Sequence, residues 1–314
     1  MSDKDYFMLH PLNNHFQIWI NDKLTLKYML NTTYNNLIKL MPEYYLYIEN
    51  DGCYSYLMDA PDNIPKNENF IINLLKNKGK LALKPSRGQQ GDGFYKLEYK
   101  DNVIYKNELP VNHSEFDIFI SQLKGYLIIE YINQHRDLKK ITGGGSESAL
   151  RIIIIKNKYE TIYTEPKYYC ITAIARIGTL LSGIISTCMK GAVGIKFDFE
   201  TGLFEDKFFI YNRFKENFSK DNTCFLDVHP DTKISLKGKI LPNHDILKNV
   251  TINICRYLSS LEFFGFDFII TDEGVRLLEI NTHPDIYQEC YGPLLAVDPT
   301  KSFFEQKKKK RNMH

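Results

Sequence analysis

Short apolar runs separated by polar turns extend over most of the chain and predict more strands than helices. Apolar residues at helical spacing predict helices over 67–79, 114–123 and 244–260, and a glycine ends the first of them. Runs rich in aromatic and β-branched residues predict strands over 44–48, 80–84, 93–99, 126–132, 150–155, 168–178, 193–199, 266–271 and 275–280. Because the order shows no βαβ rhythm, we expect an α+β fold with mostly antiparallel strands.

The composition is that of an ordinary globular protein with ample residues for a core, since 43% of the 314 residues are hydrophobic. The 40 basic and 38 acidic residues leave a net charge of +2, so we expect no nucleic-acid partner. The six cysteines are scattered without a C-x-x-C pair, which indicates reduced thiols rather than a zinc site or a disulfide framework.

The start of the chain, MSDKDYFMLHPLNN, has no continuous apolar stretch and is not typical of a signal peptide. No apolar run in the sequence is long enough to span a bilayer, so we expect a cytoplasmic protein without a transmembrane segment. The end, KKKKRNMH, is expected to be a solvated terminus, with contact to an anionic membrane as the alternative.

A glycine-rich loop follows the predicted strand 80–84 in the stretch LALKPSRGQQGDGFYKL. The strand ends at Lys84, and Gly88, Gly91 and Gly93 then allow consecutive backbone N–H groups to fold over anionic oxygens. The loop lacks the G-K-[ST] ending of a P-loop and does not open a helix. We interpret it as a phosphate-binding loop, with an ordinary glycine-rich hairpin as the alternative.

Acidic and amide side chains gather on the predicted hairpin in FGFDFIITDEGVRLLEINTHPD. Glu279 and Asn281 are two residues apart and share one side of their strand, and pairing through the DEG turn brings Asp267 beside Glu279. Two carboxylates and an amide oxygen suit Mg²⁺ that holds nucleotide phosphates, and we expect their replacement to leave the fold intact. The alternative is a polar sheet edge with solvated acids.

In this order, the segments resemble the ATP-grasp superfamily, the group of biotin carboxylase, D-alanine–D-alanine ligase and the ribosomal-protein glutamate ligases. The motifs that carry the resemblance are Asp-Lys opening a helix (Asp22-Lys23), K-P with its glycine loop (84–93), the hinge strand IIEYI (128–132), the arginine-bearing strand ALRIIII (149–155) and D…E-x-N (Asp267, Glu279, Asn281). More narrowly, NQHRDL after the hinge, ARIG at 175–178 and HPDTKISLKGKILP at 229–242 are similar to the ATP-grasp proteins associated with sugar transfer. Those proteins are typically found with genes for capsule or other surface glycans.

The resemblance implies an ATP-grasp fold, in which two α+β lobes grip ATP between them, here with only a short N-terminal extension. We expect an N-terminal segment over 1–79, a first lobe with the glycine-rich loop over 80–132, a second lobe with the metal site over 133–300 and a basic flexible tail over 301–314. The region before Lys23 is too short for the α/β domain that precedes ATP-grasp in many ligases. The acceptor site is therefore expected to be built from insertions or to be shared with a partner.

The resemblance also implies roles for individual residues. The lysines would contact ATP phosphates, the glycines would form a mobile lid and the hinge would hold adenine. The residues that match these ATP-binding motifs are Lys23, Lys84, Gly88, Gly91, Gly93, Glu130, Tyr131 and Ile132. Arg151 and Arg176 match arginines that stabilise charge on the transferred phosphoryl group and the acyl phosphate, and they are the catalytic candidates. A plain surface lysine at Lys23 and a structural ion pair at Arg176 are the alternatives.

Three segments stay open. Gln134, His135 and Asp137 follow the hinge, where the family usually places a ribose-binding acid, and the sequence does not decide among them. TGGGSES at 142–148 fits a substrate loop and a flexible turn equally well. STCMKGAVG at 186–194 lacks the asparagine and paired glycines usual in the family, which puts the phosphate contacts of that loop in doubt.

The implied activity is that of an ATP-dependent carboxylate–amine ligase with ATP and Mg²⁺ as cofactors, for which Mn²⁺ can substitute. A carboxylate attacks the γ-phosphoryl group, and an amine then attacks the acyl phosphate and releases phosphate. The substrates would be a small-molecule carboxylate and amine in surface polysaccharide biosynthesis, with sugar-linked substrates and a partner from a glycan-assembly system as further options. No catalytic Cys, Ser or His is assigned. The alternatives are an ATP-grasp kinase acting on a small-molecule or sugar-linked acceptor, and a non-catalytic nucleotide-binding or scaffold protein.

Overall fold

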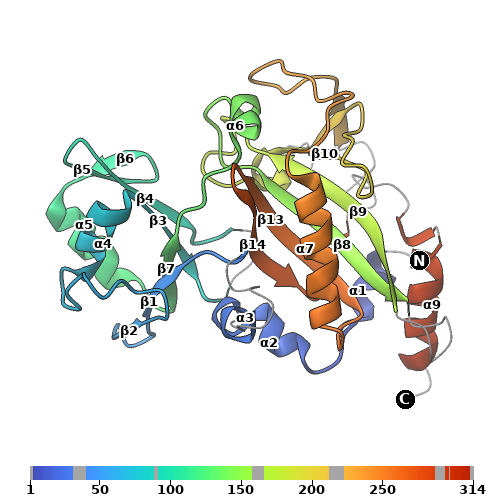
Figure 1. Cartoon of the computed structure of the whole chain (residues 1–314), viewed down its shortest axis with the longest axis horizontal. Helices are drawn as coiled ribbons and strands as arrows, with labels where there is room; N and C mark the ends of the chain where they lie inside the picture. The colour runs from blue at the N-terminus through green and yellow to red at the C-terminus, as the bar shows by residue number, and fades with distance from the viewer. Residues whose placement is uncertain are drawn as a thin grey trace. The chain divides into compact units, whose positions relative to one another are not determined.

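The computed structural model describes residues 3–30, 40–87, 91–157, 166–211, 223–286, 294–296 and 298–311. The chain forms two compact units, and a seven-stranded sheet lies in each of them (Figure 1). Unit 1 combines Met1–Asn21 with Gln134–His314, and unit 2 consists of Asp22–Asn133. Every pairing between neighbouring strands is antiparallel, as the sequence predicts.

Unit 2 is a sheet with two helices packed on one of its faces. The strand order is β2-β1-β7-β3-β4-β5-β6. The strands are β1 (Tyr44–Ile48), β2 (Tyr54–Tyr56), β3 (Lys80–Pro85), β4 (Tyr95–Lys100), β5 (Val103–Lys106), β6 (Leu109–Val111) and β7 (Tyr126–Glu130). The helices are α3 (Lys23–Leu30), α4 (Phe70–Lys78) and α5 (His113–Gln122).

The alternation of β3 decides which side chains of unit 2 enter the core. Leu81 and Leu83 are fully buried and pack with Phe70 of α4 and Phe116 of α5. Side chains of neighbouring residues in a strand point to opposite faces, so Lys80, Ala82 and Lys84 lie on the other face. The helices are set by local signals: a capping box of Asn112 and Glu115 begins α5, and a glycine with positive φ ends α4.

Unit 1 is a larger sheet with helices on both faces. The strand order is β12-β11-β10-β9-β8-β13-β14. The strands are β8 (Ala149–Asn157), β9 (Lys167–Ile177), β10 (Val193–Lys196), β11 (Phe208–Tyr211), β12 (Thr223–Leu226), β13 (Phe263–Thr271) and β14 (Gly274–Asn281). The α-helices are α1 (Asp3–Met8), α2 (Gln17–Asn21), α6 (Arg136–Thr142), α7 (His244–Tyr257) and α9 (Thr300–Arg311), with short 3₁₀ helices at η2 (Cys188–Lys190) and η4 (Leu294–Ala296).

The two faces of the unit 1 sheet differ in what covers them. Helix α7 crosses one face in Figure 1 and buries the side chains of Leu247 and Ile254. On the other face, Phe263 packs in one apolar cluster with residues of α1 and α9, among them Tyr6 and Phe304. This second face also carries Asp267, because it is four residues from Phe263 on the same strand.

The expected division of the chain differs from the structure at both of its ends. The expected N-terminal segment 1–79 is split, since 1–21 belongs to unit 1 and the strands and helices within 22–79 belong to unit 2. The expected boundary at 132/133 lies one residue from the observed one. Part of the expected flexible tail is instead helix α9, because Phe303 and Phe304 are 6% and 1% exposed within the apolar cluster of unit 1.

Asn13 connects the N-terminal segment to the hairpin of unit 1. Its side-chain amide donates to the carbonyl oxygens of Phe263 and Thr282 at 2.8 and 3.1 Å. Its side-chain oxygen accepts from the backbone N–H groups of Glu262 and Phe263 at 2.8 and 3.0 Å. One buried amide therefore bridges the start of β13 and the end of β14.

We expect Asn13→Ala to lower the free energy of unfolding of unit 1 by about 3 kcal/mol, because several buried backbone groups lose their hydrogen-bond partner. The measurement is urea unfolding followed by fluorescence of Trp19, which is the single tryptophan and belongs to the same unit. Asn14→Ala is the control, since Asn14 is exposed and its amide donates to Ser260. Equal unfolding midpoints for the two variants would show that Asn13 has no bridging role.

Candidate functional site

Three lysines lie beside aromatic rings on the face of the unit 2 sheet opposite helices α4 and α5. Lys80, Ala82 and Lys84 share this face of β3. Lys96 of β4 lies on the same face, because it pairs with Ala82. The Nζ atoms of Lys80 and Lys96 lie 5.8 and 5.4 Å from the ring centre of Tyr131. The Nζ of Lys84 lies 5.7 Å from the ring centre of Tyr44. These cation–π contacts hold positive charge on one surface.

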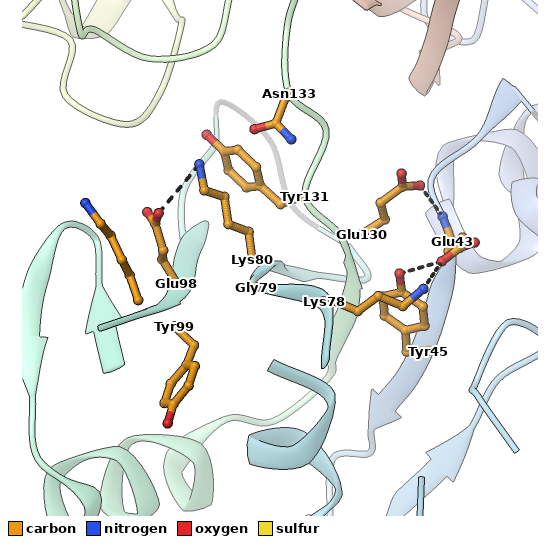
Figure 2. A pocket seen from close by; sticks show the side chains of 11 residues that line it. Glu43, Tyr45, Lys78, Gly79, Lys80, Glu98, Tyr99, Glu130, Tyr131 and Asn133 are labelled. Carbon is orange, nitrogen blue, oxygen red and sulfur yellow. Dashed lines mark hydrogen bonds and ion pairs between the residues drawn. The ribbon is translucent and has the colours of Figure 1, made fainter. Parts of the chain in front are cut away.

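Glu98 partly neutralises this cationic face. Its carboxylate oxygens lie 3.6 Å from Lys80 Nζ and 3.5 Å from Lys96 Nζ, and Figure 2 shows Lys80 between Glu98 and Tyr131. The sequence prediction missed Lys80, Lys96 and Glu98. Period-two alternation of the strand could have placed Lys80 with Lys84, but Lys96 and Glu98 also require the register between β3 and β4.

A cavity of about 520 Å³ opens at the end of the sheet where the hinge leaves β7 (Figure 2). Among the residues that line it are Glu130, Tyr131 and Asn133 of the hinge, with Lys80 and Glu98 of the cationic face. Two of the predicted adenine-binding residues, Glu130 and Tyr131, are therefore brought to one cavity. Ile132 is buried and 6% exposed.

One oxygen of Glu130 is engaged within unit 2. Oε2 of Glu130 accepts a hydrogen bond from the backbone N–H of Glu43 at 3.0 Å. The carboxylate of Glu43 in turn accepts from the hydroxyl of Tyr45 at 2.6 Å and pairs with Lys78 at 2.8 Å. Burial and the nearby Glu43 carboxylate raise the pKa of Tyr45, so this hydroxyl stays a hydrogen-bond donor. These hydrogen bonds and the ion pair connect four residues that line the cavity.

Lys23 and the glycine loop lie in the same unit. Asp22 begins helix α3 by accepting from the backbone N–H of Thr25 at 2.8 Å, and Lys23 is 8% exposed, which excludes a plain surface lysine. Gly91 and Gly93 have φ of +71° and +74°, a conformation that favours glycine. Gly88 lies outside the described residues.

In unit 1, one row of side chains crosses three strands. Asp267 of β13 pairs with Glu279 of β14 on one side and with Arg151 of β8 on the other. The predicted proximity of Asp267 and Glu279 is confirmed. Asn281, two residues further along β14, donates its side-chain amide to Glu279 at 3.2 Å.

Two arginines hold the carboxylate of Asp267. Arg151 donates from Nε and Nη2 to its two oxygens at 2.5 and 3.1 Å, and Nη2 of Arg176 lies 3.0 Å from Oδ2. Burial alone would raise the pKa of Asp267, but the charges and hydrogen bonds of the arginines hold that pKa well below its usual range. Nε of Arg176 is buried and has no hydrogen-bond partner among the described residues, so one donor of this cluster stays available.

The observed arrangement of Asp267, Glu279 and Asn281 fits the predicted metal site only in part. Asp267, Glu279 and Asn281 supply oxygen ligands of the kind Mg²⁺ prefers, and the row places them on one face. Both oxygens of Asp267 are engaged by arginines, however, and the described residues contain no group of three or more His, Cys, Asp or Glu that could hold a metal. A metal at this row would therefore bind Glu279 and Asn281 and share Asp267 with the arginines.

The loop TGGGSES at 142–148 packs against the segment around Gly178. A Cβ on Gly145 would lie 2.8 Å from backbone atoms of Gly178 and Thr179, so the glycine permits this close approach. Ser146 and Ser182 share a hydrogen bond of 3.1 Å between their hydroxyl groups. Gly178 directly follows the strand that carries Arg176, so this contact fixes the end of that strand. These contacts favour a packed turn over a flexible one, and a substrate role stays a prediction.

The HPDT turn at 229–232 also packs against the segment around Gly178. The ring of His229 is fully buried and lies 3.2 Å from the carbonyl oxygen of Gly178. Asp231 accepts from the backbone N–H of Leu180 at 2.9 Å, and the hydroxyl of Thr232 donates to the carbonyl of Ile141 at 2.9 Å. The sequence prediction gave these residues no role, because their contacts lie far away along the chain.

The three residues that follow the hinge, Gln134, His135 and Asp137, have different environments. Gln134 is 5% exposed, and its side chain is bonded to Ser148 and Thr142. The ring of His135 caps helix α6 by accepting from the backbone N–H of Asp137 at 3.1 Å. Asp137 is exposed and pairs with Lys140 at 2.9 Å. Asp137 is the one carboxylate among these three residues and is accessible, and its role as the ribose-binding acid stays a prediction.

These two antiparallel α+β units, with a lysine-bearing strand before a glycine loop and an acid hairpin, define an ATP-grasp protein. The family model described as sugar-transfer associated ATP-grasp matches residues 9–293, and the chain therefore belongs to that family. The resemblance and the fold class predicted from the sequence are confirmed. No curated protein matches the chain.

Solved structures similar to the chain are distant in sequence. D-alanyl-alanine synthetase A from Vibrio cholerae O1 biovar eltor is 12% identical with a TM-score of 0.47, over 94% of this chain and 66% of that one. D-alanine–D-alanine ligase from Bacillus anthracis is 13% identical with a TM-score of 0.45, over 96% and 72%. The ATP-grasp ligase PsnB, complexed with a minimal precursor, is 12% identical with a TM-score of 0.44, and the alignment spans 95% of this chain but 63% of PsnB.

The environment of Asp267 corrects the expectation that its replacement leaves the fold intact. We expect Asp267→Asn to lower the free energy of unfolding by about 3–5 kcal/mol at neutral pH, because two partly buried arginines lose their counter-charge. Glu279→Gln removes the same charge from a less buried position and is the matched control, with an expected loss of about 1 kcal/mol or less.

The pH dependence of this difference follows from the lowered pKa. A carboxyl with a lowered folded-state pKa stabilises the fold above its unfolded pKa of about 3.9, and this contribution is lost as the pH falls towards the folded value. The difference between the two variants should thus stay constant from neutral pH to about pH 5. Equal unfolding midpoints for both variants in urea would contradict a structural role for the Asp267 ion pairs.

Proposed function

We propose that the protein is an ATP-dependent carboxylate–amine ligase that forms an amide or peptide bond through an acyl phosphate. The observation that carries this proposal is the row of Asp267, Arg151 and Glu279 with Arg176, on the sheet of a member of the ATP-grasp family. It joins carboxylates suited to a nucleotide-bound metal with arginines suited to phosphoryl oxygens.

The cationic face of unit 2 supports nucleotide binding. Lys84 and Lys23 would contact ATP phosphates, and Gly91 and Gly93 allow the loop beside them to fold over these oxygens. The cavity at Glu130 and Tyr131 has room for the adenine base, with the Glu130 carboxylate and the hinge backbone as hydrogen-bond partners. The cation–π contacts of the lysines keep the face preorganised for an anion.

The row in unit 1 supports the phosphoryl transfer. Mg²⁺ held by Glu279, Asn281 and Asp267 would offset the negative charge of the phosphates. Arg151 and Arg176 would stabilise charge on the phosphoryl group and on the acyl phosphate, since their side chains are only 13% and 15% exposed. Asp267 fixes the orientation of both arginines, so their side chains lose little freedom when substrate binds.

The reaction needs positioning and electrostatics rather than a covalent nucleophile. The substrate carboxylate attacks the γ-phosphoryl group and releases ADP, and an amine then attacks the acyl carbon and expels phosphate. The family description supports a sugar-linked substrate from surface glycan assembly, such as a sugar acid or an amino acid destined for a polysaccharide. Expulsion of water would protect the acyl phosphate from hydrolysis.

Hydroxylamine trapping tests the acyl phosphate directly. The protein is incubated with Mg-ATP, candidate carboxylates and hydroxylamine, and a hydroxamate is expected together with ADP. Release of ADP with a phosphorylated alcohol and no hydroxamate would favour the alternative, an ATP-grasp kinase. No ADP release with any candidate, despite ATP binding, would favour a non-catalytic nucleotide-binding protein.

Lys84→Ala tests the placement of the nucleotide. We expect the variant to keep the wild-type melting temperature without ligand and to lose most of the increase caused by Mg-ATP, because a ligand that binds only the folded state raises its stability. Lys124→Ala, at an exposed lysine of the same unit, is the control and should keep the full increase. An unchanged Mg-ATP shift in Lys84→Ala would place the phosphates elsewhere.

A further inference from the structure

Large apolar side chains are exposed along the N-terminal segment of unit 1. Phe16, Ile18 and Trp19 are 43%, 69% and 56% exposed, at helix α2 and the turn before it. The buried side chains of α2 are Gln17 and Ile20, so the exposed ones do not hold the helix on the sheet. A cluster of this kind indicates a binding surface.

A basic run contacts the chain segment that leads to these apolar side chains. Helix α9 ends in Lys307–Arg311, and Nζ of Lys307 donates to the carbonyl oxygen of Leu12 at 2.8 Å. Phe16 is four positions after Leu12, so their Cα atoms lie within about 14 Å of each other. In Figure 1, α2 and the C-terminal end of α9 both lie on the lower side of unit 1.

Helix α9 itself carries mostly positive charge. The sequence of α9, TKSFFEQKKKKR, contains a single acidic residue, Glu305. Lys307 pairs with Glu262 at 2.9 Å and thereby neutralises that carboxylate, whereas Lys308 and Lys309 are exposed. The only ion pair of Lys308 with a described residue is the long one to Asp5, at 3.9 Å.

We propose that the surface formed by Phe16, Ile18, Trp19, Lys308 and Lys309 docks the protein on a membrane that carries anionic lipid headgroups. Tryptophan and other large apolar side chains enter the headgroup region, and lysines beside them attract anionic lipids. Lysine is depleted at protein–protein interfaces, so this combination favours lipid over a protein partner.

The docking would be peripheral. Across the described part of the chain, the helices are too short or too polar to cross a bilayer. The surface includes none of the residues proposed for ATP binding or catalysis, so the docking needs no nucleotide and stands independently of the proposed reaction.

Vesicle flotation with the full chain tests the docking. The protein is mixed with vesicles of phosphatidylcholine alone or of phosphatidylcholine with phosphatidylglycerol, at low and high salt. It should float with the anionic vesicles at low salt and stay unbound with the neutral ones. The pairs Ile18→Ser/Trp19→Ser and Lys308→Ala/Lys309→Ala should each lower the partition coefficient by about tenfold or more, from lost apolar contact and lost charge respectively.

Matched controls remove similar groups elsewhere in unit 1. Leu180→Ser/Leu181→Ser removes two apolar side chains that are 65% and 68% exposed, and Lys237→Ala/Lys239→Ala removes two exposed lysines. Both control variants should bind anionic vesicles as the wild type does. Absence of flotation by the wild type, or an equal loss in the controls, would overturn the proposal. The two test pairs lie on different helices, so a folding defect in one leaves the other decisive.

Discussion

The ion pairs of Asp267 with two arginines are the constraint on which the site in unit 1 depends. A carboxylate that is 6% exposed requires compensating charge, because an isolated buried charge is strongly unfavourable. Arg151 comes from the neighbouring strand and Arg176 from the strand beyond, so the three side chains tie β13, β8 and β9 together in addition to their backbone ladders. Glu279 on the other side then faces a carboxylate whose charge is already compensated, which removes the repulsion expected between paired acids.

The cationic face of unit 2 gathers positive charges, which also require compensation. Lys80, Lys84 and Lys96 share one face of a sheet, and like charges there repel unless something offsets them. Glu98 offsets part of the charge and Glu108 pairs with Lys96, while the rings of Tyr131 and Tyr44 also contact the lysines. The face keeps an excess of positive charge while its side chains are held in place, which is the preorganisation that anion binding requires.

The sequence could predict the parts of this protein that depend on neighbours along the chain. Strand 44–48 and the hairpin near 266–281 are specified by runs of aromatic and β-branched residues and a glycine turn, and both lie where the pattern predicts. The hairpin is local, so the sequence could also predict that Asp267 pairs with Glu279. The order of the weak motifs was enough to predict the fold family, because an ordered combination of motifs is far more specific than each motif alone.

Only the tertiary structure decided which distant segments meet. The pairing of Arg151 with Asp267 joins residues 116 positions apart, and the register between such strands is set by packing of the whole sheet. Helix α9 forms where a solvated tail was expected, because Phe303 and Phe304 are buried against residues from the opposite end of the chain. The sequence by itself thus determined the longer strands, the hairpin turn and the candidate chemistry through local patterns, and it missed the short strands β2, β5, β6, β11 and β12. Tertiary packing decided the salt bridges, the division into units and which lysines share a face, because these depend on contacts that no local pattern encodes.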